Sequence, residues 1–241
     1  MSRPRLRILV SLLAALLLAP AALVWPAPAE EAKLLNQIRQ QMAPAYKRYE
    51  GIHSLRHSRV YEYDAQTGEL VREMKVTAER RDFFYRYPEV RVLSYEANGV
   101  SLSPEKFSSY EFSPPYPVFD EQGESRYHLA LEGLVRMGNE NCYRVRVDPK
   151  RRTGRHFSGY MYFHEESLDL VYLKGTLARL TFGLREFEIE FHFTMMDGTP
   201  VFEKGVARGR AYVPFFQPDR RLISYMEMPR QKLIPRPAVV Q

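Results

Sequence analysis

The sequence predicts an α+β domain built on one antiparallel sheet with a single apolar face. The main evidence is residues 142–213, where strand-like runs with period-2 alternation are joined by short turns. One such run alternates apolar with charged or polar side chains, and its apolar members are Phe187, Ile189, Phe191 and Phe193. A parallel sheet buried on both faces would show continuous Val, Ile and Leu runs instead. What covers the apolar face therefore decides the function.

Residues 1–29 are expected to be a cleavable signal peptide. Three arginines precede an apolar run over residues 8–18, and Ala27-Pro28-Ala29 supplies small residues where a signal peptidase cuts, so the mature chain should begin at Glu30. A retained membrane anchor is the alternative, because apolar residues continue to Trp25. Prolines interrupt that run, and it is short for a span of about 20 residues. We therefore expect a protein of the bacterial periplasm.

Charge and cysteine content argue against several functions. The 35 basic and 29 acidic residues give a net charge of +6, but removal of the three N-terminal arginines leaves 32 and 29, a net charge of +3. So small an excess is weak support for nucleic-acid binding. Cys142 is the only cysteine, so one chain can form neither a disulfide nor a thiolate zinc site. We expect no cofactor and no metal.

Residues 30–49 should form the helix of this fold. Apolar side chains recur there at spacings of three and four residues, at Leu34, Leu35, Ile38, Met42 and Tyr46. Pro44 should kink the helix or split it in two. The polar face carries both signs of charge, which argues against docking on a membrane surface. We therefore expect the apolar stripe to lie on the sheet.

The first strands are expected at residues 54–64 and 69–81, followed by 81–88 and 89–97, with turns at Gly68 and at Asn98-Gly99. Residues 101–125 then lose all periodicity. They are rich in proline and carry Phe107, Phe112 and Phe119, which suggests a flap that packs on the sheet.

Strands resume at residue 127, and we expect a frayed tail over residues 232–241. Residues 30–241 are thus expected to form a single domain.

The loop at Asp197-Gly198 sets the register of the hairpin around it. A two-residue loop would place Phe191 opposite Lys204 and so bring a cation to the apolar face. A three-residue loop, 196–198, instead pairs Phe187 with Ala207, Ile189 with Gly205 and Glu190 with Lys204. Because a buried unpaired cation costs several kcal/mol, we predict the three-residue loop.

Catalytic signatures are weak. His53 and His57 fall in a strand, where their spacing holds them apart, and the sequence lacks a nucleophile elbow, a phosphate-binding loop and a dinucleotide fingerprint. One basic cluster lies in a turn between strands and consists of Lys150, Arg151, Arg152 and Arg155. It is either a solvated hairpin tip or a contact for anionic headgroups.

Aromatic content is the remaining signal. The chain has 16 Tyr and 14 Phe, all after residue 29. Such side chains, with methionine among them, either fill a core or line an adaptable apolar cavity. If a cavity forms, the candidate lining residues are Phe187, Ile189, Phe191, Phe193, Met161, Phe163, Phe107, Phe112, Phe119, Leu35, Ile38 and Met42.

Three motifs resemble the LolA-like family of periplasmic lipoprotein carriers and outer-membrane lipoprotein-sorting proteins. They are the strand ending Tyr-x-Val-x-Val-x-Pro-Lys at residues 143–150, the hairpin at residues 163–171 with Ser167 in place of Thr, and the turn Asp197-Gly198-x-Pro200. The resemblance implies an unclosed, strongly curved antiparallel barrel, a half-barrel whose apolar concave face takes acyl chains beneath helices. It brings no catalytic residues.

The resemblance favours a monomeric, non-catalytic carrier of lipid or lipoprotein acyl chains. The Pro-rich segment at residues 101–125 departs from the helical lid of the well-known carriers. A sensor or scaffold of the same fold, which binds an inner- or outer-membrane protein, is the alternative. A hydrolase ranks third, because the sequence lacks a nucleophile motif.

Overall fold

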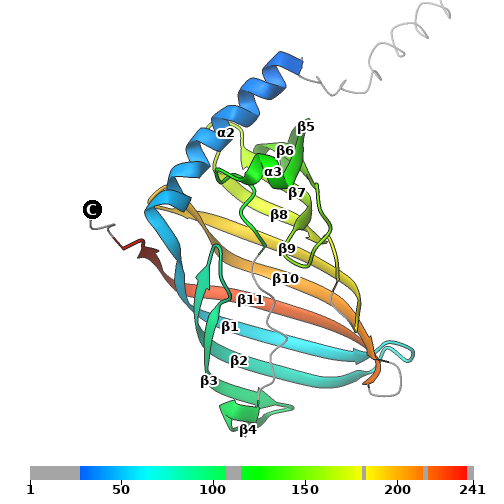
Figure 1. Cartoon of the computed structure of the whole chain (residues 1–241). Coiled ribbons are helices and arrows are strands. Elements are labelled where there is room, and N and C mark those ends of the chain that lie inside the picture. The colour runs from blue at the N-terminus through cyan, green and yellow to red at the C-terminus, as the bar shows by residue number, and fades with distance from the viewer. Residues whose placement is uncertain (1–27, 107–114, 181–182, 214–216, 238–241) are drawn as a thin grey trace, which may run out of the picture.

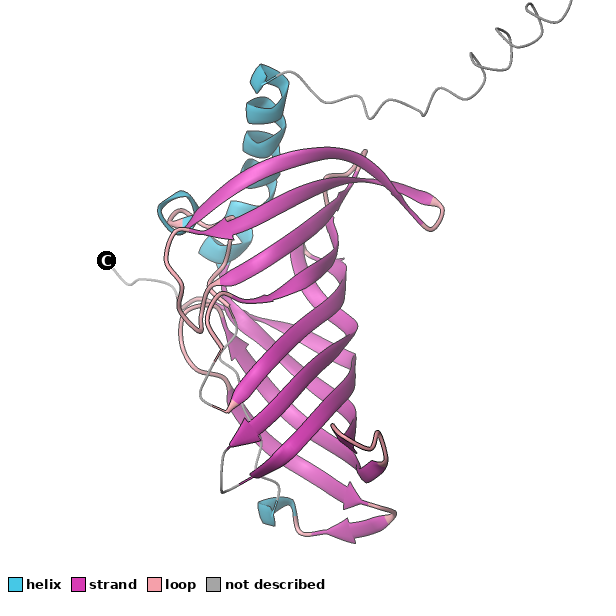
Figure 2. Ribbon diagram, turned by 90° about the vertical axis from the view of Figure 1, so that its right-hand side faces the viewer, coloured by secondary structure: helices cyan, strands magenta, loops and turns pink. Residues whose placement is uncertain are grey.

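The computed structural model describes residues 28–106, 115–180, 183–213 and 217–237. Its strands form one antiparallel sheet in the order β4-β3-β2-β1-β11-β10-β9-β8-β7-β6-β5, so β4 and β5 are open edges. The sheet curls strongly, and helix α2 (Pro28–Arg48) crosses it near β5 to β8 (Figures 1 and 2). The predicted α+β class and the unclosed half-barrel are thus confirmed.

Eleven strands make up the described sheet. Their bounds are β1 Tyr49–Asp64, β2 Leu70–Phe83, β3 Glu89–Ala97, β4 Val100–Leu102, β5 Tyr127–Met137, β6 Glu140–Pro149, β7 Phe157–His164, β8 Leu170–Leu177, β9 Leu184–Met196, β10 Thr199–Val213 and β11 Gln217–Pro235. The separate strand expected at residues 81–88 is wrong, because residues 81–83 end β2 and a loop follows.

Helix α2 lies with its apolar stripe on the sheet. Ile38 and Met42 are fully buried, and the helix continues through Pro44, so the predicted split at that residue is wrong. The Gln41 Nε2 donates to the Asp169 Oδ1 at 2.8 Å. The backbone N–H of Leu131 donates to the Oε1 of Glu31, on the first turn of α2, at 2.9 Å. These bonds tie the helix to the turn between β7 and β8 and to the edge strand β5.

Burial of this stripe forms the main core. It joins α2 to the concave side of β5 to β9 and to residues 118–119, and its fully or nearly fully buried members include Ile38, Met42, Phe119, Leu131, Val145, Val147, Phe157 and Phe163. The Phe119 and Phe163 rings meet edge to face, with their centroids 5.2 Å apart.

The predicted register of the β9–β10 hairpin is wrong. The loop has two residues, Asp197 and Gly198, and both have positive φ, as a type I′ turn requires. A bulge at Glu203 then adds one residue to β10 and shifts the pairing. Phe191 therefore faces Gly205 instead of Lys204, so the bulge keeps the cation away from the apolar face, as the three-residue loop was expected to do.

Two further expectations concern irregular segments. The frayed tail is wrong for residues 232–235, because β11 continues to Pro235 and pairs Leu233 with Ile52 of β1. Of the predicted flap, residues 107–114 with Phe107 and Phe112 lie outside the described residues, as do residues 1–27 of the predicted signal peptide. Its other parts include a 3-10 turn, Pro104–Lys106, and a short helix, α3 (Gly123–Arg126).

Candidate ligand-binding cavity

A cavity of about 730 Å³ lies against the concave face of the sheet. Its apolar wall comes from β7 to β10, and the lining side chains there include Phe157, Met161, Leu173, Phe187, Ile189, Phe191, Phe193, Phe202 and Ala207. Ligand pockets in proteins commonly enclose about 300–1,000 Å³ and are mostly apolar. Size and lining therefore suit a small apolar or amphipathic molecule.

The apolar wall is uneven because large side chains face small ones across the strand pair. Phe191 lies opposite Gly205, Ile189 opposite Ala207, and Phe187 opposite Gly209. A Cβ atom added at Gly205 would lie 2.5 Å from the Phe191 ring, so the ring packs directly on the backbone of β10. Phe202 completes the contact, with its ring centroid 4.6 Å from that of Phe191.

The structure divides the predicted lining residues into two groups. Five of them line the cavity, namely Met161, Phe187, Ile189, Phe191 and Phe193. The others that the structure describes pack in the core beneath α2, and they are Phe163, Phe119, Ile38, Met42 and the partly buried Leu35. From the helix it is Tyr46, one turn beyond Met42, that reaches the cavity.

A polar wall adjoins the apolar one, since β11 pairs with β10, and sequence reasoning missed it. It comes from β1, β2 and β11, and its polar members are Ser54, Arg56, Ser58, Glu62, Arg72, Arg80, Asp82, Ser224 and Gln231. On β1 these side chains occupy alternate positions between Ile52 and Val60, which also line the cavity. A strand with such a mixed face gives no clear signal of which face points inward. The cavity is thus amphipathic.

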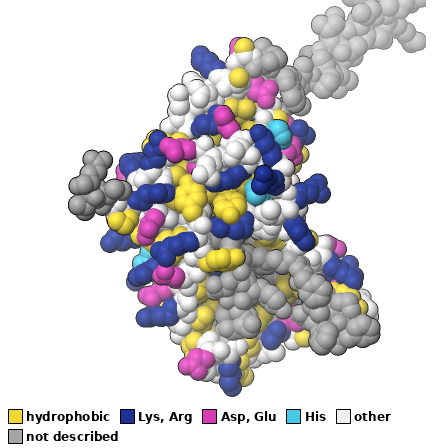
Figure 3. All heavy atoms as spheres, viewed as in Figure 1, with side chains coloured by type: hydrophobic (Ala, Val, Ile, Leu, Met, Phe, Trp, Pro, Cys, Tyr) yellow, Lys and Arg dark blue, Asp and Glu magenta, His cyan; other side chains and the backbone are white. Residues whose placement is uncertain are grey.

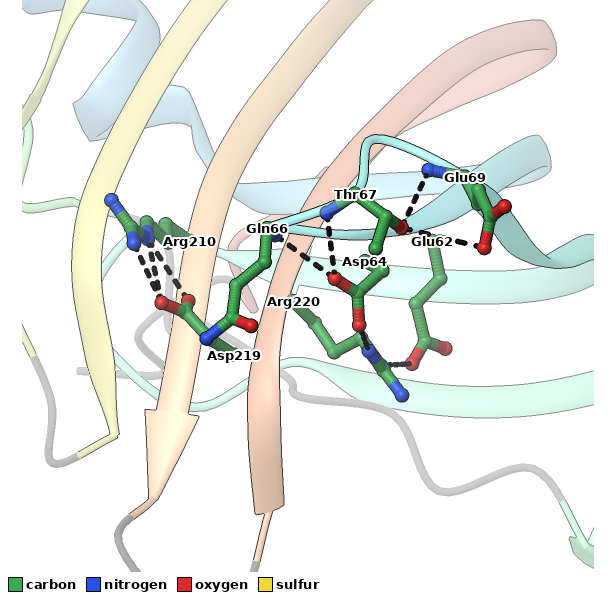
Figure 4. A network of polar contacts seen from close by, with 8 residues as sticks. All are labelled: Glu62, Asp64, Gln66, Thr67, Glu69, Arg210, Asp219 and Arg220. Carbon is green, nitrogen blue, oxygen red and sulfur yellow. Dashed lines mark hydrogen bonds and ion pairs between the residues drawn. The ribbon is translucent and has the colours of Figure 1, made fainter.

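An ionic network stands at one end of the polar wall (Figure 4). Glu62 accepts from the Arg72 Nε and Nη2 atoms at 2.9 and 2.6 Å, and the Arg220 Nε atom lies 3.3 Å from its other oxygen. Arg220 also binds Asp64, whose carboxylate accepts the backbone N–H groups of Thr67 and Gln66 and the Arg220 guanidinium, so that the pKa of Asp64 is lowered. The network joins the β1–β2 turn to β11.

Residues 115–118 border the cavity on another side and are anchored by Asp120. This buried carboxylate accepts from the Arg126 Nη1 at 2.8 Å and from the Tyr85 hydroxyl at 2.9 Å. Burial and this hydrogen bond raise the pKa of Tyr85 to about 12. Charge-assisted hydrogen bonds to Asp120 therefore hold this bordering segment to α3 and to the loop after β2.

The basic cluster does not line the cavity. Lys150, Arg151 and Arg152 are exposed between β6 and β7, and Lys150 donates to the backbone carbonyl of Glu124 at 2.6 Å. The Arg155 guanidinium stacks on the Tyr116 ring, 4.1 Å from its centroid. Arg151 and Arg152 are exposed to solvent, Lys150 is held by its bond to Glu124, and Arg155 packs on the segment that borders the cavity.

The described residues hold no group of three or more His, Cys, Asp or Glu side chains placed to bind a metal ion. Among the helices described, none is long and apolar enough to cross a membrane. On the face drawn in Figure 3, basic and acidic side chains are interspersed, and hydrophobic side chains gather near its centre. That face presents no large patch of a single charge.

No protein-family model and no curated protein matches the chain. Among solved structures, it is similar to a LolA superfamily protein from Nitrosomonas europaea, at 9% identity over 86% of this chain and 94% of that chain, with a TM-score of 0.37. An outer membrane lipoprotein-sorting protein domain from Vibrio parahaemolyticus matches at 8% identity over 85% and 92%, with a TM-score of 0.39.

The MucA/MucB complex of Pseudomonas aeruginosa matches at 10% identity over 83% of this chain and 99% of that chain, with a TM-score of 0.25. Proteins of the LolA-like class, which the sequence motifs resemble, are thus among the solved structures similar to this chain. At these identities and TM-scores the likeness carries no argument about function, which has to come from the cavity.

Proposed function

We propose that this chain is a periplasmic, non-catalytic carrier that holds acyl chains of a lipid or lipoprotein in its cavity. The observation that carries the proposal is the cavity of about 730 Å³, whose apolar wall contains Met161 and four alternating side chains of β9. Each Å² of apolar surface that leaves water contributes about 25 cal/mol, so an acyl chain on this wall is bound without any specific polar contact.

The shape of the wall supports an occupant of variable form. Glycines at 205 and 209 let the rings of Phe191 and Phe187 pack close to β10, and methionines at 226 and 228 line the cavity from β11. Methionine is flexible and adapts to irregular shapes. A carrier that takes up and releases its cargo needs such a surface more than a rigid pocket.

The proposal is tested by extraction of the full chain after purification from a bacterial periplasm, followed by lipid mass spectrometry. We expect co-purifying lipid in wild type and less of it in Ala207→Phe, which fills the cavity with a ring. Val206→Phe, at the next position of β10 on the other face, is the matched control and should retain lipid. Wild-type protein that carries no lipid and takes none up from vesicles would contradict the proposal.

A sensor or scaffold for a membrane protein is the second candidate, and one observation favours it. Leu93 and Val100 are 40% and 59% exposed on β3 and β4, at an open edge of the sheet, and Leu70 is 52% exposed at the start of β2. An apolar strand segment of a partner could pair there. This function predicts a protein free of lipid that binds the periplasmic segment of a membrane protein.

A further inference from the structure

The polar wall contains buried side-chain atoms without hydrogen-bond partners. Ser54 and Ser58 of β1 are 3% and 9% exposed and line the cavity, and in the part of the chain that the structure describes neither Oγ atom has a partner. The buried Oε1 atom of Gln231, on β11, also lacks a partner among the described residues. A buried polar atom without a partner destabilises a fold, so it usually marks a position that water or a ligand fills.

Two of these side chains, Ser54 and Gln231, lie directly opposite each other on neighbouring strands. They are partners in the β1–β11 pair, both line the cavity, and they do not bond to each other. The side chains of such a pair share one face of the sheet, with Cβ atoms about 4.5–5.5 Å apart. One small polar group can therefore contact both. Ser58 lies roughly 13 Å further along β1 and is outside this contact.

The neighbouring backbone fixes the direction of the Gln231 amide. Its Nε2 atom donates to the carbonyl oxygen of Phe202 at 2.7 Å and lies 3.4 Å from that of Met228. A carbonyl oxygen only accepts, so the nitrogen has to face these two groups and Oε1 takes the other side. Oε1 is itself an acceptor and can be satisfied only by an O–H or N–H group. The Ser54 hydroxyl both donates and accepts, so it can bond to the same group.

The charged side chains beside this pair have partners of their own. Arg80, opposite Ser54 on β2, has its Nε atom 3.0 Å from an oxygen of Asp82, and Arg56 also has an interaction of its own. What this point of the wall lacks is thus a hydrogen-bonding group and not a counter-ion.

We propose that Ser54 and Gln231 form a subsite for a polar head group that carries an O–H or N–H donor. The inference rests on the proposed carrier function and adds the class of cargo, an acyl compound whose head bears a hydroxyl or an amide N–H. Such a head donates to the Gln231 Oε1 and forms a second hydrogen bond with the Ser54 hydroxyl. Its acyl chain lies on the adjoining apolar wall of β9 and β10.

The test compares four ligands that share one oleoyl chain. 1-Oleoylglycerol donates through hydroxyls and oleamide through N–H groups, whereas methyl oleate and oleate have no donor at neutral pH. Binding to the delipidated full chain is measured by displacement of a fluorescent acyl probe. Methyl oleate has the most apolar head, so burial of apolar surface alone favours it. We expect at least one ligand with a donor to bind roughly fivefold more tightly than both ligands without one, and the tighter one identifies the donor.

Substitutions then locate the preference. Ser54→Ala and Gln231→Met should each lose most of it and keep the affinity for methyl oleate. Ser94→Ala on β3 and Gln66→Met in the β1–β2 turn, both at exposed positions, are the matched controls and should behave as wild type. Because the Ser54 Oγ has no partner among the described residues to lose, Ser54→Ala should also keep the thermal midpoint of wild type. The comparison of ligands on wild type needs no variant to fold.

Each outcome has a distinct meaning. If the four ligands bind wild type equally, if a ligand without a donor binds most tightly, or if the variants lose affinity for all ligands alike, the subsite is refuted while the carrier function stands. If none of the four binds to wild type, the carrier function itself fails, and the subsite fails with it.

Discussion

The two halves of the concave face show how one strand pattern can yield either a core or a cavity. Beneath α2, β5 to β8 present side chains such as Val145 and Phe163, which are 0% exposed. From β9 to β2 the same face lines the cavity, which also reaches Met161 of β7 and Leu173 of β8, and there Phe191 remains only partly buried. Both halves belong to one antiparallel sheet with the same period-2 alternation, so the difference comes from what covers each half.

Helix α2 explains where the division falls. Its polar contacts reach β5 and the β7–β8 turn, so its apolar stripe is placed over one end of the sheet (Figure 1). Beyond Tyr46 the helix ends and the chain enters β1, so among the described residues α2 does not extend over the rest of the concave face. A helix of this length and position cannot fill both halves.

The largest expected effect contrasts a phenylalanine from each half. Phe163→Ala removes a fully buried ring from the core and should lower the free energy of unfolding by about 3–5 kcal/mol. Phe191→Ala removes a ring that already borders a cavity, so it should cost much less. Denaturant unfolding of both variants measures the difference, and equal losses would show that the cavity half is an ordinary packed core.

A glycine in the cavity half gives the next largest effect. At Gly205 an added Cβ would lie 2.4 Å from the Glu190 carbonyl oxygen and 2.5 Å from the Phe191 ring, so Gly205→Ala should destabilise by about 1–3 kcal/mol. At Gly209 the nearest atom is 3.3 Å away, and Gly209→Ala should cost less than half as much. Thermal unfolding of the pair checks this, and a reversed order would contradict the observed register.

The ionic end of the polar wall should contribute less than the core. Glu62→Gln removes the charge that binds Arg72 and Arg220, and we expect a loss of about 1–2 kcal/mol, because the Glu62 side chain is only 10% exposed. Glu96→Gln breaks the more exposed pair with Lys75 and should cost less than about 1 kcal/mol. Similar losses for Glu62→Gln and Glu96→Gln in urea unfolding would mean that burial of Glu62 does not strengthen its ion pairs.

The smallest effect is a dependence of stability on pH through His156. Burial and the nearby guanidinium groups of Arg126, Arg151 and Arg155 lower the pKa of His156 below its usual 6.5. The unfolded chain then binds the proton first, so stability is complete above about pH 6.5 and falls as the pH drops further. The thermal midpoint should therefore fall less with acid in His156→Gln than in wild type.

The sheet could be predicted from the sequence because alternation and turn residues are local signals. The turn at Asp197-Gly198 follows from its residue types, but the bulge at Glu203 does not, since it compensates for a clash that appears only when the strands pair. The sequence showed that Lys204 opposite Phe191 would be unfavourable, but the predicted three-residue loop is wrong, and the bulge at Glu203 separates the two side chains instead.

The cavity residues could be predicted only in part. The apolar side chains of β9 were found from their alternation, whereas Phe163 shares that chemistry and packs in the core with Phe119 and the apolar stripe of α2. Ser54 and Ser58 could not be found, because a polar side chain on a strand normally predicts the solvent face. Whether an apolar residue of the sheet lies in the core or in the cavity depends on which elements pack over it in the tertiary structure. The local sequence pattern does not encode this packing.

The central claim, that an acyl chain occupies the half of the concave face that α2 leaves uncovered, is tested most directly by fluorescence quenching. Trp25 is the only tryptophan, so in a Trp25→Phe background a single reporter can replace Phe191 in the cavity or Tyr162 on the opposite face of the sheet. We predict that a bromine-labelled fatty acid quenches the reporter at 191 and leaves the reporter at 162 unchanged. Equal quenching at both positions, or none at 191, would contradict the account.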